Sequence, residues 1–351
     1  MNFQNLQNQI NKDINYFFDI KTFLNKKLNK KNEKILSKKI VKNFNILKKK
    51  ENRIKYTKTN QILISKKINE KKFLFRDKIF KVKILHTLKQ FNTPFFRKYF
   101  KFFLLHGSFV TDDYVKNWSD IDTFVVLKLG VFRNYKTLIN IRERILSIYP
   151  EFLKISPFQH HGLIFLNEID LKNYNDNFIP IEALKFNLNI FENSKIVFKK
   201  VNNTNKNNSY TNLITRLQFV KKSLKKGHYD HHVLNKKKLS VPLKENEETL
   251  KQFFCHVGFM INMPILFFTS IKKSVHKKKS FRLFYKVIND KRIITFVKKH
   301  EFFRKNWNDF YLNNYNLSKK IVNFFGKDYF SHCKNNMELL IRKIDKIIKN
   351  T

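Results

Sequence analysis

Two short apolar runs, separated by a polar stretch, constrain the fold of this chain more than any other feature. The first run, Phe102–Leu105, is followed closely by Gly107 and Ser108, and the second lies within Asp120–Leu127. Eleven residues separate Ser108 from the first aspartate of the second segment. Short apolar runs rich in β-branched and aromatic residues are typical of buried strands. The sequence therefore predicts two strands joined by a loop, with glycine and serine ending one and aspartates beginning the other.

The surrounding pattern predicts a small domain with a mixed sheet. Apolar residues at helical spacing predict helices over residues 79–91 and 134–148, and residues 162–166 have the composition of a third strand. The order strand, loop, strand, helix, strand fits a compact domain over residues 76–200.

A different pattern follows the polar, Asn-rich stretch 202–209, which we interpret as a linker. Helical patterns dominate beyond it, at about 210–225, 246–270, 317–325 and 335–349. The predicted fold class is α+β, with the small mixed-sheet domain followed by an all-helical domain over residues 201–351.

The charge of the chain is strongly positive. It has 72 Lys and Arg against 27 Asp and Glu, a formal net charge of +45. Residues 1–75 are predicted to be a basic N-terminal extension that carries no chemistry. Such a charge favours a polyanionic partner and predicts salt-dependent, nonspecific nucleic-acid binding. A genome biased toward AT-rich codons would also give this composition, with 39 Phe and a single alanine, so both origins stay open.

Nothing in the sequence indicates a membrane protein. The most apolar stretch, residues 251–272, is interrupted by Gln252, His256 and Asn262, so it predicts a buried helix rather than a membrane span. The N-terminus lacks a signal-peptide pattern. The two cysteines, Cys255 and Cys333, are far apart and read as reduced thiols. We expect a cytoplasmic protein.

The aspartates and the glycine point to phosphate chemistry. Residues two apart on a strand face the same side, so Asp120 and Asp122 would present adjacent carboxylates. A divalent cation such as Mg²⁺ relieves their repulsion and leaves room for phosphate oxygens. Gly107 allows backbone N–H groups to approach a phosphate closely, and Ser108 adds a hydroxyl donor.

The combined pattern resembles the polymerase-β-like nucleotidyltransferase superfamily, and its bacterial members in particular. Leu105-His106-Gly107-Ser108 and Ser119-Asp120-Ile121-Asp122 carry the resemblance, which covers roughly residues 78–190. It implies an enzyme that transfers a nucleoside monophosphate from an NTP such as ATP to an acceptor hydroxyl and releases pyrophosphate. Asp120 and Asp122 would be catalytic and would bind Mg²⁺, with two ions expected, and Gly107 and Ser108 would hold the triphosphate.

The resemblance also implies a third carboxylate on a later strand. We favour Asp170 or Glu168, with Asp170 assigned as catalytic, and Glu182 is a further candidate. His160 or His161 could instead occupy the position, which would be a departure from the family.

Two more departures are visible. Thr123 stands where an apolar residue is more usual, and the acids Asp112 and Asp113 follow Gly-Ser where small or basic residues are common. The histidine-rich segment 228–232 follows Gly227, a predicted helix cap, and we interpret it as a loop rather than a metal site.

The acceptor stays open between a small molecule, a protein and RNA. Two other functions also stay open. Asp-x-Asp with a divalent metal occurs in glycosyltransferases, and the charge fits a catalytically silent nucleic-acid-binding protein on the same fold.

Overall fold

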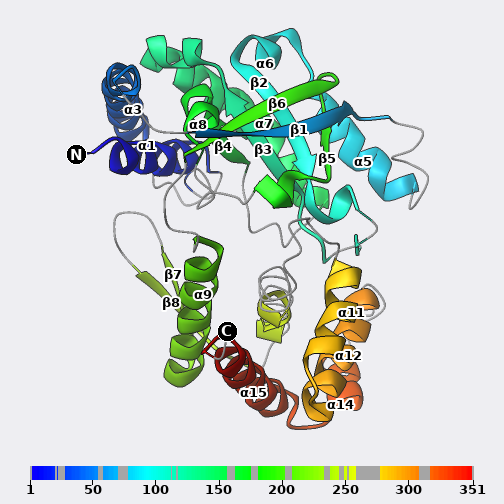
Figure 1. Ribbon diagram of the computed structural model, residues 1–351. Helices are drawn as coiled ribbons and strands as arrows, with labels where there is room; N and C mark the ends of the chain where they lie inside the picture. Colours follow the sequence, from blue (N-terminus) through cyan, green and yellow to red (C-terminus); the bar gives the residue numbers. More distant parts are fainter. Residues whose placement is uncertain are drawn as a thin grey trace. The chain divides into compact units, whose positions relative to one another are not determined.

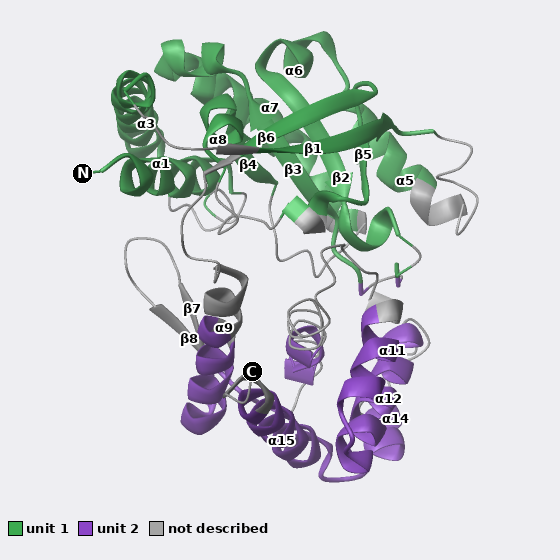
Figure 2. Ribbon diagram, viewed as in Figure 1, with its two compact units in different colours: residues 1–114, 119–204 green, residues 115–118, 205–351 purple. Residues whose placement is uncertain are grey.

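The chain forms two compact units in the computed structural model (Figures 1 and 2). The first, here called the sheet unit, comprises residues 1–114 and 119–204, and the second, the helical unit, comprises residues 115–118 and 205–351. The structure describes residues 2–19, 22, 28–53, 58–69, 78–111, 113–115, 118–155, 163–174, 181–201, 208–232, 238–244, 249–250, 253–257, 277–307 and 317–349.

The sheet unit contains six strands with helices between them. In chain order its elements are α1 (Phe3–Phe18), α3 (Lys30–Glu51), β1 (Lys58–Lys67), α5 (Lys78–Lys89), α6 (Pro94–Tyr99), β2 (Phe100–His106), η1 (Gly107–Phe109), β3 (Asp122–Leu127), η2 (Leu129–Arg133), α7 (Tyr135–Ile155), β4 (Ile164–Asn167), α8 (Glu168–Lys172), η3 (Ile181–Leu184), β5 (Asn187–Asn189) and β6 (Ser194–Val201). The strands form one sheet in the order β4-β3-β2-β5-β1-β6. The pairs β3–β4 and β1–β5 are parallel and the others antiparallel, so the predicted mixed sheet and α+β class are confirmed.

Each face of this sheet has its own core, because successive side chains of a strand point to opposite faces. On β2, Phe103 and Leu105 face a core shared with α1, α3, α5 and α7. Phe102 and Leu104 face the other core, which α8, η3 and side chains of β1 and β6 complete. Figure 1 shows the β1–β6 ribbon crossing the sheet. The strands are therefore buried on both sides, which explains why they read as unbroken apolar runs.

The prediction of a separate basic extension over residues 1–75 differs from the structure, because the described part of this region belongs to the sheet unit. Helix α1 buries Ile10, Ile14 and Phe17 in the core, and Phe44 of α3 stacks on Phe132 with ring centroids 3.9 Å apart. β1 lies inside the sheet between β5 and β6. The lysines hid this pattern, because they occupy the solvent-facing positions of helices that are apolar on one face.

A buried arginine fixes the N-terminal helices to the rest of the sheet unit. Arg142 of α7 pairs with Glu33 of α3 at 2.6 Å and donates hydrogen bonds to the Phe17 carbonyl oxygen and to Thr22 Oγ1. Its side chain is buried, and removing one member of a buried pair costs about 3–5 kcal/mol. The N-terminal helices are therefore integral to the fold.

The helical unit contains one small sheet besides its helices. Its elements are α9 (Asn208–Lys226), β7 (His228–His232), β8 (Lys238–Pro242), α11 (Lys277–Val287), α12 (Lys291–Lys305), α14 (Leu317–Phe325) and α15 (Tyr329–Lys349). Strands β7 and β8 pair antiparallel, which corrects the expectation of an all-helical region and of a loop at the histidines. Gly227 has φ +70° after α9, as expected of a helix-ending glycine.

Several predicted features fall on residues that the structure does not describe. These are most of the proposed linker and most of the apolar stretch 251–272, of which residues 253–257 are helical. Within the described ranges, no helix combines the length and the apolar character that crossing a membrane needs.

Candidate active site

The glycine of the motif lies where β2 ends. Gly107 has φ +74° and opens the short 3₁₀ helix η1, which turns the chain away from the sheet. A side chain strains this left-handed backbone conformation, whereas glycine adopts it freely. Ser108 follows directly and is partly exposed. Its hydroxyl is therefore carried on a sharp turn at the edge of the sheet.

The carboxylate of Asp122 lies against this turn. Asp122 begins β3 and pairs with His106, the last residue of β2. A Cβ atom placed on Gly107 would lie 2.3 Å from Asp122 Oδ2, closer than any real contact allows. Glycine is thus required twice, for its backbone conformation and for the space that Asp122 occupies.

Asp120 precedes the strand, which begins two residues later than the sequence predicted. Ile121 is 1% exposed and belongs to the helix-covered core, whereas Asp120 and Asp122 are both partly exposed. This alternation separates the two carboxylates from the core. Burial raises the pKa of Tyr149 on α7, and the charges of Asp19 and Asp120 add to that effect. Asp120 therefore lies within electrostatic reach of α7.

A third strand brings an amide to the same end of the sheet. Asn187 of β5 pairs with His106 on the side opposite Asp122. Directly paired residues share a face, so Asp122, His106 and Asn187 form a polar row across three neighbouring strands. Both ends of the amide are engaged, since Oδ1 accepts from the Ser65 hydroxyl and Nδ2 donates to the Leu184 carbonyl oxygen at 2.8 Å.

Sequence reasoning missed this row. The only signal for Asn187 was the alternation of asparagine and leucine in residues 187–189, which carries no charge and therefore did not suggest chemistry.

The comparisons with known proteins agree with this geometry. Residues 95–204 match the family described as nucleotidyltransferase domain. This part of the chain is a nucleotidyltransferase domain. The matched segment runs from α6 to just beyond β6 and includes Gly107, Ser108, Asp120 and Asp122. No curated protein and no solved structure matches the chain.

Asp170, the favoured third carboxylate, lies at the other end of the nucleotidyltransferase domain's sheet. Asn167, three residues before it, pairs with Leu127 at the end of β3, whereas Asp122 begins that strand. Asp170 Oδ1 accepts from Gln7 at 2.7 Å and Asn11 at 2.9 Å, and Oδ2 accepts from the Asn167 N–H at 2.8 Å. Burial raises the pKa of Asp170 to about 6 against the opposing effect of these hydrogen bonds.

Glu168 is engaged at the same end. It pairs with Lys101 at 2.7 Å and accepts from the Leu129 N–H at 2.9 Å. Burial alone would raise the pKa of Glu168, but these hydrogen bonds outweigh it and the pKa is lowered. The structure thus brings neither Glu168 nor Asp170 to the aspartate pair. His160, His161, Asp112 and the side chain of Glu182 lie outside the described residues.

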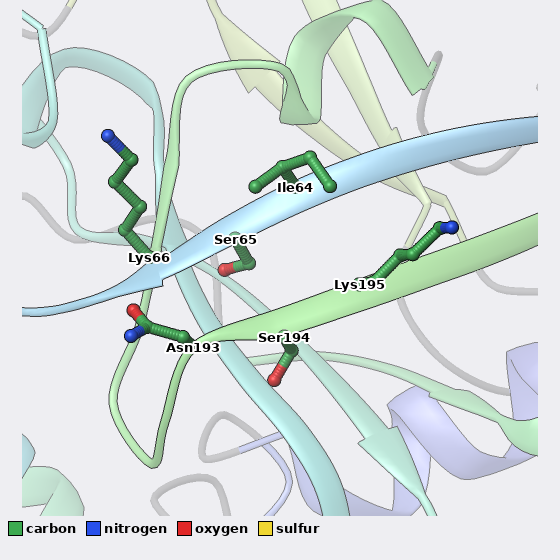
Figure 3. Close-up of a pocket in the computed structure, with 6 residues that line it drawn as sticks. All are labelled: Ile64, Ser65, Lys66, Asn193, Ser194 and Lys195. Atoms are coloured by element: carbon green, nitrogen blue, oxygen red, sulfur yellow. The ribbon is translucent and has the colours of Figure 1, made fainter.

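A hollow elsewhere on the sheet unit is distinct from the motif. It lies on the β1–β6 ribbon, and Figure 3 shows the six residues that line it: Ile64, Ser65, Lys66, Asn193, Ser194 and Lys195. None of the residues predicted from the sequence lines this hollow, and it connects to the polar row only through the hydrogen bond from Ser65 to Asn187.

The residues at the Gly107 end suit a magnesium ion that shares its ligands with a substrate. Among the described residues, no group of three or more His, Cys, Asp or Glu side chains could hold a metal by itself. Mg²⁺ commonly takes only one or two protein carboxylates and completes its shell with phosphate oxygens and water. Asp120 and Asp122 fit that need, and the turn at Gly107 leaves no side chain between Asp122 and the backbone.

Proposed function

We propose that this chain is a Mg²⁺-dependent nucleotidyltransferase, which moves a nucleoside monophosphate from an NTP to an acceptor hydroxyl. The observation that carries the proposal is the Asp122 carboxylate packed on the Gly107 turn, beside Ser108 and two residues after Asp120. A cation ligand and a phosphate cradle are thus adjacent within a nucleotidyltransferase domain.

Each residue has a separate task in this proposal. Asp120 and Asp122 hold the divalent cation, which when bound offsets the negative charge of the phosphates. The backbone N–H groups of the η1 turn and the Ser108 hydroxyl donate to the triphosphate. The acceptor oxygen bonds to the α-phosphorus, the bond from that phosphorus to the bridging oxygen breaks, and pyrophosphate leaves. The hydroxyl proton passes to a carboxylate of the pair or to water.

Asn187 sets the character of the neighbouring position. Its amide is neutral and both of its ends are hydrogen-bonded, so it supplies no negative charge to the cation. We therefore propose an active site with two carboxylates, in which Asp170 has a structural role instead of the catalytic one expected from the sequence.

The test is transfer of label from each of the four α-³²P-labelled NTPs with Mg²⁺, alone and with the small-molecule, RNA and protein fractions of a lysate. We expect labelled acceptor and pyrophosphate from the wild type, and at least a hundredfold less from Asp120→Asn and Asp122→Asn, which corresponds to about 3 kcal/mol of transition-state stabilisation. Glu151→Gln, a change in an ion pair with Lys154 on the solvent-exposed side of α7, is the matched control and should keep wild-type activity.

Equal label transfer by the wild type and both aspartate variants would contradict the proposal. The net charge of +45 favours one other function, a silent nucleic-acid-binding protein. Salt-sensitive RNA binding that is the same in wild type and variants, without label transfer in any fraction, would support that function instead.

A further inference from the structure

The loop that joins the two halves of the motif passes through the core of the helical unit. Val115 and Trp118, the described residues of segment 115–118, are 9% and 5% exposed and belong to that core. The segment carries the colour of the helical unit in Figure 2, although the residues on either side of it belong to the sheet unit. We call residues 115–118 the strap.

Trp118 is held by other aromatic rings. Its ring meets Trp307 edge-on with centroids 5.1 Å apart and lies 6.2 Å from Phe254. Trp307 and Phe254 are themselves buried and pack on Phe303. Edge-to-face aromatic packing of this kind is directional and fixes ring orientation as well as burying area. The strap is therefore ordered by helices that lie far beyond it in the sequence.

Chain length carries this order to the metal-binding pair. Asp120 is only two residues beyond Trp118, and two extended residues span at most about 7 Å. The backbone of Asp120 therefore cannot move farther than that from a ring fixed in the helical core. On its other side, Ile121 is fixed in the core of the sheet unit. Asp120 lies between two buried anchors.

We propose that Trp118 is a positioning residue, through which the folded core of the helical unit sets the place of Asp120 relative to Asp122 and Gly107. The inference rests on the proposed function, because it assigns to the helical unit a part in assembling the same metal site. It predicts that damage to Trp118 lowers turnover more than equal damage elsewhere in the same aromatic cluster.

The first experiment compares Trp118→Ala with Phe303→Ala, a matched loss of a buried ring that contacts Trp307 but does not belong to the strap. The measurements are kcat, KM for the NTP, the Mg²⁺ concentration for half-maximal rate, and thermal unfolding. We expect both variants to lose similar stability. Trp118→Ala should lose at least tenfold in kcat relative to Phe303→Ala and require more Mg²⁺, and Trp118→Phe should recover to within about threefold of wild type.

Equal kcat and Mg²⁺ requirement in Trp118→Ala and Phe303→Ala would overturn the inference, since both rings would then serve only the stability of the helical unit. Absence of transfer by the wild type would instead count against the proposed function, and a second readout keeps the strap testable in that case.

The second readout uses the fact that the chain has two tryptophans, both in this cluster. In Trp307→Phe, the emission of Trp118 alone reports on the strap. We expect its emission to change on addition of Mg²⁺ with a non-hydrolysable ATP analogue, and this response to disappear in Trp307→Phe/Asp120→Asn. An emission that does not respond, with the analogue bound according to calorimetry, would overturn the inference whether or not transfer is observed.

Discussion

The sheet unit contains two triplets of the form acid-Ile-Asp, and their surroundings differ completely. Asp120-Ile121-Asp122 stands at the start of β3, and Glu168-Ile169-Asp170 stands after the end of β4, the parallel neighbour of β3. In both, the isoleucine is buried in the same core. In the first, the acids are partly exposed beside a glycine turn. In the second, Asp170 is 1% exposed with three hydrogen-bond donors, and Glu168 is ion-paired.

The difference shows that the chemistry of a carboxylate depends on how its oxygens are occupied. Asp170 also belongs to a capping box at the start of α8, in which the Asn167 side chain accepts backbone N–H groups and Asp170 accepts the Asn167 N–H. Such a box satisfies the first turn of a helix, and here it also binds α1 through Gln7 and Asn11. A carboxylate with this many partners holds elements together and has little capacity left for a cation.

The largest expected effect is the contrast in activity between the two triplets. Asp122→Asn should lower nucleotidyl transfer at least a hundredfold while changing the free energy of unfolding by less than about 1 kcal/mol. Asp170→Asn should keep activity within about threefold and lose stability, because an amide nitrogen cannot accept from the Asn167 N–H. Transfer rates and urea unfolding of the two variants measure the contrast. Loss of transfer in Asp170→Asn at full stability would break it.

The glycine turn gives the next effect, and the chain supplies its own controls. Gly107→Ala should lower kcat/KM by about thirtyfold, roughly 2 kcal/mol, because it combines left-handed strain with displacement of Asp122. Gly227→Ala has similar strain, with φ +70° and open space, and Gly130→Ala has neither strain nor crowding.

Both control variants should keep wild-type activity, and only Gly227→Ala should lose stability. Activity loss in Gly227→Ala equal to that in Gly107→Ala would show that the space for Asp122 is unimportant.

The smallest effect is a pH dependence of stability. The folded-state pKa of Asp170 is about 6, above its ordinary value of 3.8. Its contribution to stability is therefore fully present below pH 3.8 and is lost as the pH rises through about 6. The difference in unfolding free energy between wild type and Asp170→Asn should shrink by about 1–2 kcal/mol from pH 4 to pH 7. Urea titrations at several pH values measure it, and a difference that grows with pH would mean that the hydrogen bonds outweigh burial.

The sequence predicted the parts of this molecule whose signals are local. The strands around Gly107 and Asp122 are short apolar runs with polar ends, and α14 was predicted at residues 317–325 where the structure has Leu317–Phe325. The glycine was predicted to serve the backbone, but the packing of Asp122 against it depends on the pairing of β2 with β3. That pairing can be seen only in the fold.

Other features could not be predicted, because they depend on contacts distant in sequence. Asp170 looked catalytic because its partners Gln7 and Asn11 lie 163 and 159 residues away. Helices α1 and α3 looked like a solvated extension because lysines separate their apolar residues. The burial of Trp118 beside Trp307 had no signal in the loop itself.

The most direct test of the central claim is a measurement of metal binding by the two triplets. Mn²⁺ can replace Mg²⁺, and its electron paramagnetic resonance signal distinguishes bound from free ions. With a non-hydrolysable ATP analogue present, we predict that wild type and Glu168→Gln/Asp170→Asn bind Mn²⁺ with equal affinity, and that Asp120→Asn/Asp122→Asn binds it at least tenfold more weakly. Equal Mn²⁺ affinity in all three proteins, or weaker binding only in Glu168→Gln/Asp170→Asn, would contradict the assignment of the cation site to Asp120 and Asp122.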